Sequence, residues 1–288
     1  MQGNKFILYF FSISMFCCNQ PDVVSQNNAS PVSPQEQLIQ IINERGNTIE
    51  SRFNVPAGYE RIPVDANSFG YYLRNLPLKP AGSVVMYYNG DTKNDLVYDA
   101  VIDMDIGTKD LQQCADAVMR LRAEYLFSIK QYDHISFVLT NGFRMDYTEW
   151  MKGNRLVVSG NKTNWSKSAE PSNTYKDFRK YMDVVFSYAG SLSLSKSMKP
   201  KIIRDIAIGD VFVHGGLPGH AVIVVDVAES KTGGRIFIIA QSFMPAQEIH
   251  ILKNFSDESV SPWYKNNIAD QLNSPQWSFP INELKSFE

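Results

Sequence analysis

One thiol, one imidazole and one carboxamide are ordered along the chain as in a cysteine nucleophile system. Cys114 lies in a segment with helical periodicity, residues 108–130; His220 opens the apolar segment 220–228, and Gln241 follows in the next apolar segment. A thiol with a pKa of about 8.5 is mostly protonated at neutral pH, so it needs an imidazole to take its proton. A third group then orients the imidazole ring. The order predicts Cys114 as nucleophile, His220 as base and then acid, and Gln241 as the orienting group.

Strand register decides whether Gln241 reaches His220. We expect residues 220–228 and 235–243 to form a hairpin across the glycine-bearing segment between them. If the two residues pair directly, or are offset by two, both side chains lie on one face of the sheet. A shift by one residue turns Gln241 away and brings Ala240 or Ser242 round instead.

Each of these residues also has a purely structural interpretation. A buried cysteine on the apolar stripe of a helix is a common packing residue. We expect the helix cap near Thr108, which places Cys114 in the second turn, where helix-end electrostatics have faded. His214 comes just before the Gly-rich turn and could exchange roles with His220. His250, in the alternating segment EIHIL, is expected to be a sheet residue.

Four further residues are candidates for the surroundings of the nucleophile. Gln113 or Gln112 could donate a hydrogen bond to an oxyanion, and Trp263 with Tyr264 could line a cleft. The segment GGLPG lacks the Lys and Ser/Thr of a phosphate-binding loop, and no His-rich or acidic cluster completes a metal site. We therefore expect neither a metal nor any other cofactor.

The order of predicted elements indicates an α+β fold. Two amphipathic segments, residues 108–130 and 175–194, precede a last third made mainly of strands. The strand 220–228 is apolar on both alternate faces, which predicts cover on both sides. The expected architecture is a helix packed on an antiparallel sheet, with an N-terminal extension.

The N-terminal residues resemble an export signal. One lysine precedes an apolar run from Phe6 to Phe16, which is short for a membrane span and typical of a secretory signal. Cys18, or alternatively Cys17, would be the lipidated residue if this is a bacterial lipoprotein signal. A plain signal peptide or an uncleaved anchor is the alternative.

This interpretation sets the domain boundaries and the compartment. Residues 1–18 are the predicted signal, 19–36 a flexible tether, and 37–288 a single α+β domain, divided into an N-terminal subdomain (37–100) and a core (101–288). The expected location is the bacterial envelope, in the periplasm or at the cell surface, with a lipid anchor in the membrane. A formal net charge of -2 argues against a nucleic-acid partner.

The local pattern Gly-Asp, strand, turn, His, strand, running from Gly209 to His220, resembles NlpC-type papain-like cysteine peptidases. The resemblance implies a papain-like core and cleavage of an amide bond in peptidoglycan peptide. Those enzymes carry Asp-Cys-Ser-Gly at the nucleophile, where this chain has Gln-Cys-Ala-Asp, residues 113–116. The alternative is the same fold without turnover, serving as an envelope binding or scaffold module.

Three longer strings resemble a second family. QQCADAVMRLRAEYL, GLPGHAVIVVDVA and AQSFMPAQEIHIL are similar to a bacterial family known as a domain of unknown function. That resemblance extends over most of the chain after the signal and implies no activity, but Cys114, His220 and Gln241 all lie within these strings.

Overall fold

A large antiparallel sheet carries two of the three candidate residues. The computed structural model describes residues 40–287, which fall in one compact unit. The strand order is β2-β11-β10-β9-β8-β15-β7; β1 also pairs with β9, and β12 with β10. The main strands are β1 (Tyr59–Arg61), β2 (Tyr98–Val101), β7 (Lys199–Pro200), β8 (Val211–His214), β9 (His220–Ser230), β10 (Arg235–Gln241), β11 (His250–Leu252), β12 (Tyr264–Lys265) and β15 (Leu284–Ser286).

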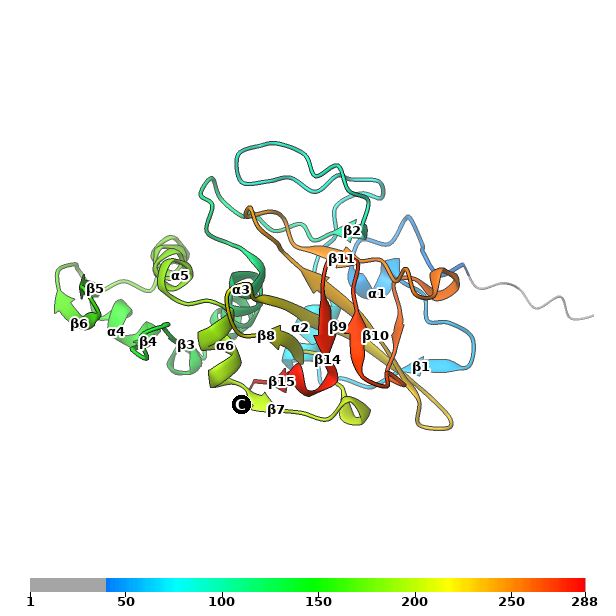
Figure 1. Ribbon diagram of the computed structural model, residues 1–288. Helices are drawn as coiled ribbons and strands as arrows, with labels where there is room; N and C mark the ends of the chain where they lie inside the picture. The colour runs from blue at the N-terminus through cyan, green and yellow to red at the C-terminus, as the bar shows by residue number, and fades with distance from the viewer. Residues whose placement is uncertain (1–39, 288) are drawn as a thin grey trace, which may run out of the picture. The chain divides into compact units, whose positions relative to one another are not determined.

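The helices and three short hairpins complete the fold. In Figure 1 the green segment with α4, α5 and β3 to β6 lies to the left of the large sheet, and β1, which pairs with β9, lies toward the right of the view. The α-helices are α1 (Ile49–Arg52), α2 (Phe69–Arg74), α3 (Cys114–Ser128), α4 (Tyr147–Met151), α5 (Tyr175–Tyr188) and α6 (Ser191–Ser197). The hairpin strands are β3 (Ser136–Val138), β4 (Arg144–Asp146), β5 (Asn154–Ser159), β6 (Lys162–Lys167), β13 (Gln271–Asn273) and β14 (Ser278–Pro280).

Both faces of β9 are buried, as its sequence predicts. On one face Ala221 and Ile223 pack in the core that contains residues of α3. On the other face Val222 and Val224 pack in a second core with C-terminal residues such as Phe279. The predicted α+β fold, with helices and a large antiparallel sheet, is confirmed at this level.

A β-bulge in β9 sets the register at the candidate site. Ile238 pairs with Asp226, but Ile239 pairs with Val224, so β9 contains one extra residue at this point. Extending the register beyond the bulge places Gln241 opposite Val222, on the same face as His220. Without the bulge Gln241 would lie opposite Ile223 and face away from His220. The offset by two residues, one of the two favourable registers, is therefore the one observed.

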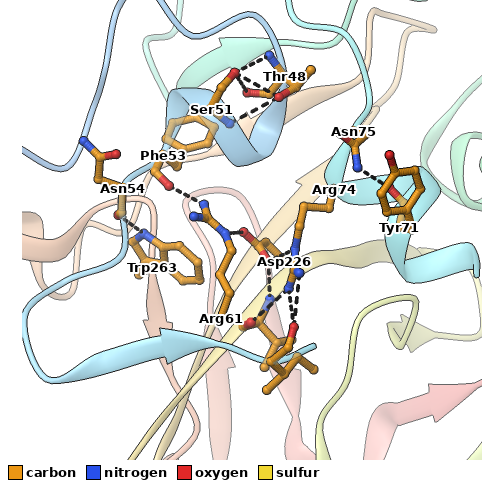
Figure 2. A network of polar contacts seen from close by, with 12 residues as sticks. Thr48, Ser51, Phe53, Asn54, Arg61, Tyr71, Arg74, Asn75, Asp226 and Trp263 are labelled. Atoms are coloured by element: carbon orange, nitrogen blue, oxygen red, sulfur yellow. Dashed lines mark hydrogen bonds and ion pairs between the residues drawn. The ribbon is translucent and has the colours of Figure 1, made fainter. Parts of the chain in front are cut away.

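A buried ionic network holds Asp226, the residue next to the extra residue of the bulge, Val225. The Asp226 carboxylate is fully buried and accepts hydrogen bonds from Arg61 Nε at 2.7 Å and Arg74 Nε at 2.8 Å. Figure 2 shows both guanidinium groups converging on it, Arg74 from α2 and Arg61 from β1. Arg74 also donates to the Ile62 carbonyl. Because the two arginines fix the direction of the Asp226 side chain, we infer that they stabilise the bulge.

The predicted helix around Cys114 begins later than expected. The cap expected near Thr108 is wrong: α3 begins at Cys114, and Gln113 is its N-cap. The residues before it form turns instead, in which Asp105 Oδ1 accepts from the Gly107 amide. The backbone N–H of Gln113 donates to Asp116 Oδ2 at 3.0 Å, which closes the first turn of the helix.

The predicted export segment lies outside the described residues. Cys17, Cys18 and the proposed tether all belong to this N-terminal part of the chain. Across residues 40–287, no helix has the length and apolar character to cross a bilayer.

Candidate active site

His220 and Gln241 form a buried hydrogen-bonded pair. His220 is the first residue of β9 and Gln241 the last of β10; each is 1 % exposed. The distance from His220 Nε2 to Gln241 Oε1 is 2.8 Å. Burial lowers the pKa of His220 to about 4, although the hydrogen bond to Gln241 acts in the opposite direction. The ring is therefore neutral at pH 7.

Aromatic rings enclose the imidazole. The ring centroids of Phe243, Trp277 and Phe279 lie 4.8, 5.5 and 5.7 Å from that of His220. Phe243 follows β10, whereas the other two come from the C-terminal segment around β14. These contacts exclude water from the ring and account for its low pKa.

His250 anchors the Gln241 amide on one side. His250 Nδ1 lies 2.8 Å from the Glu248 carbonyl oxygen, which can only accept, so Nδ1 carries the proton. Burial lowers the pKa of His250 to about 3, so the ring is neutral and Nε2 is an acceptor. That acceptor lies 3.3 Å from Gln241 Nε2. The amide nitrogen of Gln241 therefore faces His250.

Gln276 anchors the same amide from the other side. Gln276 Nε2 donates to Asp95 Oδ2 at 2.9 Å, which leaves Gln276 Oε1 to accept from Gln241 Nε2 at 2.7 Å. Both anchors therefore require that Gln241 Oε1 faces His220. His220 Nε2 must then donate, which places the lone pair of the neutral ring on Nδ1. No residue of the described part bonds to this Nδ1.

Cys114 is the first residue of α3 and is 8 % exposed. Burial, which is the larger cause, and the charge of Asp116 raise the pKa of the Cys114 thiol to about 11. The backbone amides of Ala115, Ala221 and Cys114 itself act in the opposite direction. The Ala221 contact places the thiol beside the residue that follows His220. At pH 7 the thiol is protonated.

The structure brings Cys114 and His220 to the same end of β9 without bonding them. Within residues 40–287, no hydrogen bond joins the thiol to the imidazole. The sulfur is instead near backbone amide donors, which favour the thiolate once its proton is removed. The arrangement contains a thiol, a neutral imidazole with a fixed tautomer and an orienting amide, and all three groups are buried. We call this buried arrangement the closed state.

Asp116 is a buried carboxyl group close to the thiol. Its Oδ1 atom has no hydrogen-bond partner in the described structure, and burial raises the pKa of Asp116 to about 8. At neutral pH the carboxyl group is therefore mostly protonated. Its negative charge appears only at higher pH, where it opposes ionisation of Cys114.

The two predicted oxyanion donors differ in their contacts. Gln113 Nε2 donates to Asp110 Oδ1 at 3.1 Å, so its amide is engaged. Gln112 is 1 % exposed, its Oε1 accepts from Arg120, and its Nε2 has no partner among the described residues. Gln112 is therefore the donor that remains available.

The remaining predicted residues lie elsewhere. Trp263 is fully buried and Tyr264 is 3 % exposed; the two pack in different cores and present no open aromatic surface. His214 pairs with Glu283 through Nδ1 at 2.6 Å and lies across from His220 in the β8–β9 ladder.

The sequence interpretation missed the anchors of Gln241. His250 was expected to be a sheet residue; it is one, and it also contacts the Gln241 amide. Pairing the segment around Gln241 with the segment around His250 could have predicted this contact, because Gln241 and His250 lie directly opposite each other in the β10–β11 ladder. Gln276 contacts Gln241, and Asp95 contacts Gln276, only through tertiary contacts, and no local pattern marks either residue.

Comparison with known proteins gives a family but no function. No curated protein and no solved structure matches the chain. A family model described as domain of unknown function (4846) matches residues 49–286, a range that includes Cys114, His220 and Gln241. The chain belongs to this family, DUF4846.

Proposed function

We propose that the protein is an exported cysteine hydrolase with a papain-like core that cleaves an amide bond in peptidoglycan peptide. The observation that carries the proposal is the 2.8 Å hydrogen bond between His220 and Gln241, beside the first residue of α3, Cys114. A helix N-terminus and backbone amides near the sulfur favour a thiolate nucleophile. The order of these residues matches the resemblance to NlpC-type peptidases.

The proposed reaction begins with proton transfer from the Cys114 thiol to Nδ1 of His220. The sulfur attacks the carbonyl carbon, and the oxyanion accepts hydrogen bonds from the Cys114 backbone amide and Gln112 Nε2. The imidazolium of His220 then protonates the leaving nitrogen, the C–N bond breaks and a thioester remains. Water, deprotonated by His220, attacks the thioester, and the carboxylic acid leaves as the thiol reforms.

The envelope location rests on the N-terminal sequence. Lipidation of Cys18, or of Cys17, followed by the tether of residues 19–36, would hold the domain at a membrane surface within reach of peptidoglycan. Peptidoglycan or another envelope peptide is therefore the proposed partner, and a nucleic acid is not.

A second candidate function is a non-catalytic envelope binding or scaffold module. The burial of all three residues favours it, because a thiol with a pKa raised to about 11 is unreactive in the resting state. In this case the His220–Gln241 pair only fills the space between the two cores.

Alkylation of the full-length protein tests the two candidates against each other. The rate at which iodoacetamide modifies Cys114 is measured from pH 5 to 10, with peptide mapping to separate Cys114 from Cys17 and Cys18. A hydrolase predicts a rate component between pH 5 and 7 that depends on the imidazole and disappears in His220→Ala. If the rate instead rises tenfold per pH unit in both proteins, the thiol is an ordinary buried cysteine and the hydrolase proposal fails.

A further inference from the structure

A polar cavity of about 310 Å³ lies at a distance along α3 from Cys114. It is lined by residues of α3, the β3–β4 hairpin and α6, and by Phe287 near the end of the chain. None of its lining residues belongs to the set of Cys114, His220 and Gln241. The polar lining residues are Arg122, Asp133, His134, Ser136, Arg144 and Ser197.

Arg122 is held in this cavity by aromatic rings. Its guanidinium carbon lies 5.0 Å from the ring centroid of Phe69, 5.5 Å from that of Tyr125 and 5.4 Å from that of Phe287. These three cation–π contacts restrain the position of the guanidinium group. They leave the N–H donors at its edge available.

The guanidinium of Arg122 has no acceptor for these donors. Within residues 40–287 it makes no hydrogen bond and no ion pair, although the side chain is half-buried. An arginine remains charged in proteins, and a partly desolvated charge without a counter-ion is unfavourable. A bound anion would supply both the counter-charge and the acceptors.

The other charged residues of the cavity indicate the charge of that anion. Arg144 Nε is engaged with Asp146 at 2.7 Å and with Ser136 at 3.0 Å, so its charge is already balanced. Asp133 adds a carboxylate at the rim, where its side chain is 77 % exposed. With one free cation and one nearby carboxylate, the cavity suits a single negative charge and disfavours a dianion.

The apolar part of the lining indicates the rest of the ligand. Leu126, Phe137 and Leu194 are buried residues that contribute to the cavity wall. A group with apolar atoms would contact this wall, and Ser136 and Ser197 belong to the same lining. A small inorganic anion would leave the apolar wall unused.

We propose that this cavity binds an organic monocarboxylate, with the carboxylate in a two-point contact with Arg122 and the apolar part against Leu126 and Leu194. Carboxylate and guanidinium match in geometry because both are planar and offer paired acceptors and donors. The site is independent of any reaction at Cys114.

The test is an NMR titration of the full-length protein with butyrate, benzoate and inorganic phosphate. The Nε–Hε signal of Arg122, assigned with the Arg122→Lys variant, should shift on addition of either carboxylate, and phosphate should bind at least tenfold more weakly. Arg122→Gln should abolish binding. Arg122→Lys keeps the positive charge but loses the paired donors, and should weaken binding at least tenfold.

The matched control is Arg204→Gln, which removes an exposed guanidinium that is paired with Asp205 and lies outside the cavity lining, and should change affinity less than threefold. Circular dichroism and the melting temperature show whether each variant is folded. Unchanged binding in a folded Arg122→Lys protein would overturn the assignment of Arg122. Phosphate binding as tight as that of benzoate would overturn the ligand class, and an unshifted Arg122 signal at 50 mM benzoate would overturn the site.

Discussion

Removing the ionisable group of Asp116 should make the protein more stable at alkaline pH. In the folded chain burial raises the pKa of Asp116 to about 8, whereas an unfolded aspartate titrates near its ordinary value of about 4. Between these two values the folded form holds a proton that the unfolded form has lost. The contribution of Asp116 to stability is therefore complete below pH 4, decreases as the pH rises, and is lost above pH 8.

The size of the effect follows from the two pKa values. A difference of about four pH units, at about 1.4 kcal/mol per unit, corresponds to roughly 5 kcal/mol. In Asp116→Asn the side chain stays neutral at every pH, and its amide oxygen can still accept the hydrogen bond from the Gln113 backbone N–H. The buried Asn amide and the protonated acid each carry donor hydrogens in this position, so the two proteins should have similar stability at pH 4 to 5. At pH 9 the variant should be more stable by up to roughly 5 kcal/mol.

Urea unfolding followed by tryptophan fluorescence measures this difference at one-unit steps from pH 5 to 9. Asp133→Asn is the control, because that carboxylate is 77 % exposed and should change stability by less than about 0.5 kcal/mol at any pH. A difference between wild type and Asp116→Asn that does not grow with pH would refute the reasoning, since it would mean that Asp116 is ionised in the folded protein at pH 5.

Three further outcomes are expected. Asp226→Asn should lower the free energy of unfolding by about 3 to 5 kcal/mol in urea titrations, because it leaves the buried guanidinium of Arg74 and the half-buried one of Arg61 without their carboxylate. Asp205→Asn at the surface should have almost no effect. The neutral His220 ring should show an exchange-protected Nε2 proton in ¹H–¹⁵N spectra that is lost in Gln241→Leu; a proton on Nδ1 in the wild type would contradict the proposed tautomer. Trp277→Ala should hydrate His220 and raise its pKa from about 4 toward its ordinary value of about 6.5, and an unchanged NMR titration would show that Trp277 does not bury the ring.

The local patterns of the sequence predicted the elements but not the exact register. The hairpin of β9 and β10 follows from two apolar runs and a glycine-bearing turn, and it is present. We infer that the bulge that brings Gln241 to the side of His220 is stabilised by Asp226, whose partners Arg61 and Arg74 lie more than 150 residues earlier in the chain. Such a contact is a tertiary property, so hydrophobic alternation alone left the register open.

The start of α3 shows the same limit. Helical periodicity predicted the helix, but the cap expected near Thr108 was wrong because residues before Cys114 form other contacts. Asp110, for example, accepts hydrogen bonds from Gln113 and from the distant Ala246 amide, and this holds the segment in turns. As a result Cys114 lies at the helix N-terminus, where it is closer to the helix dipole than the sequence suggested.

The closed state of the site limits how the proposed hydrolase could work. With a thiol pKa of about 11 and an imidazole pKa of about 4, moving the proton from Cys114 to His220 in this state costs on the order of 10 kcal/mol. Burial is the first cause of both shifts, so the same hydration that raises the pKa of His220 would lower that of Cys114. Phe279 is part of a fully buried core, whereas Phe243 and Trp277 are only half-buried. We therefore expect an active state to displace Phe243 or Trp277 from the imidazole while the sheet and the His220–Gln241 pair stay in place.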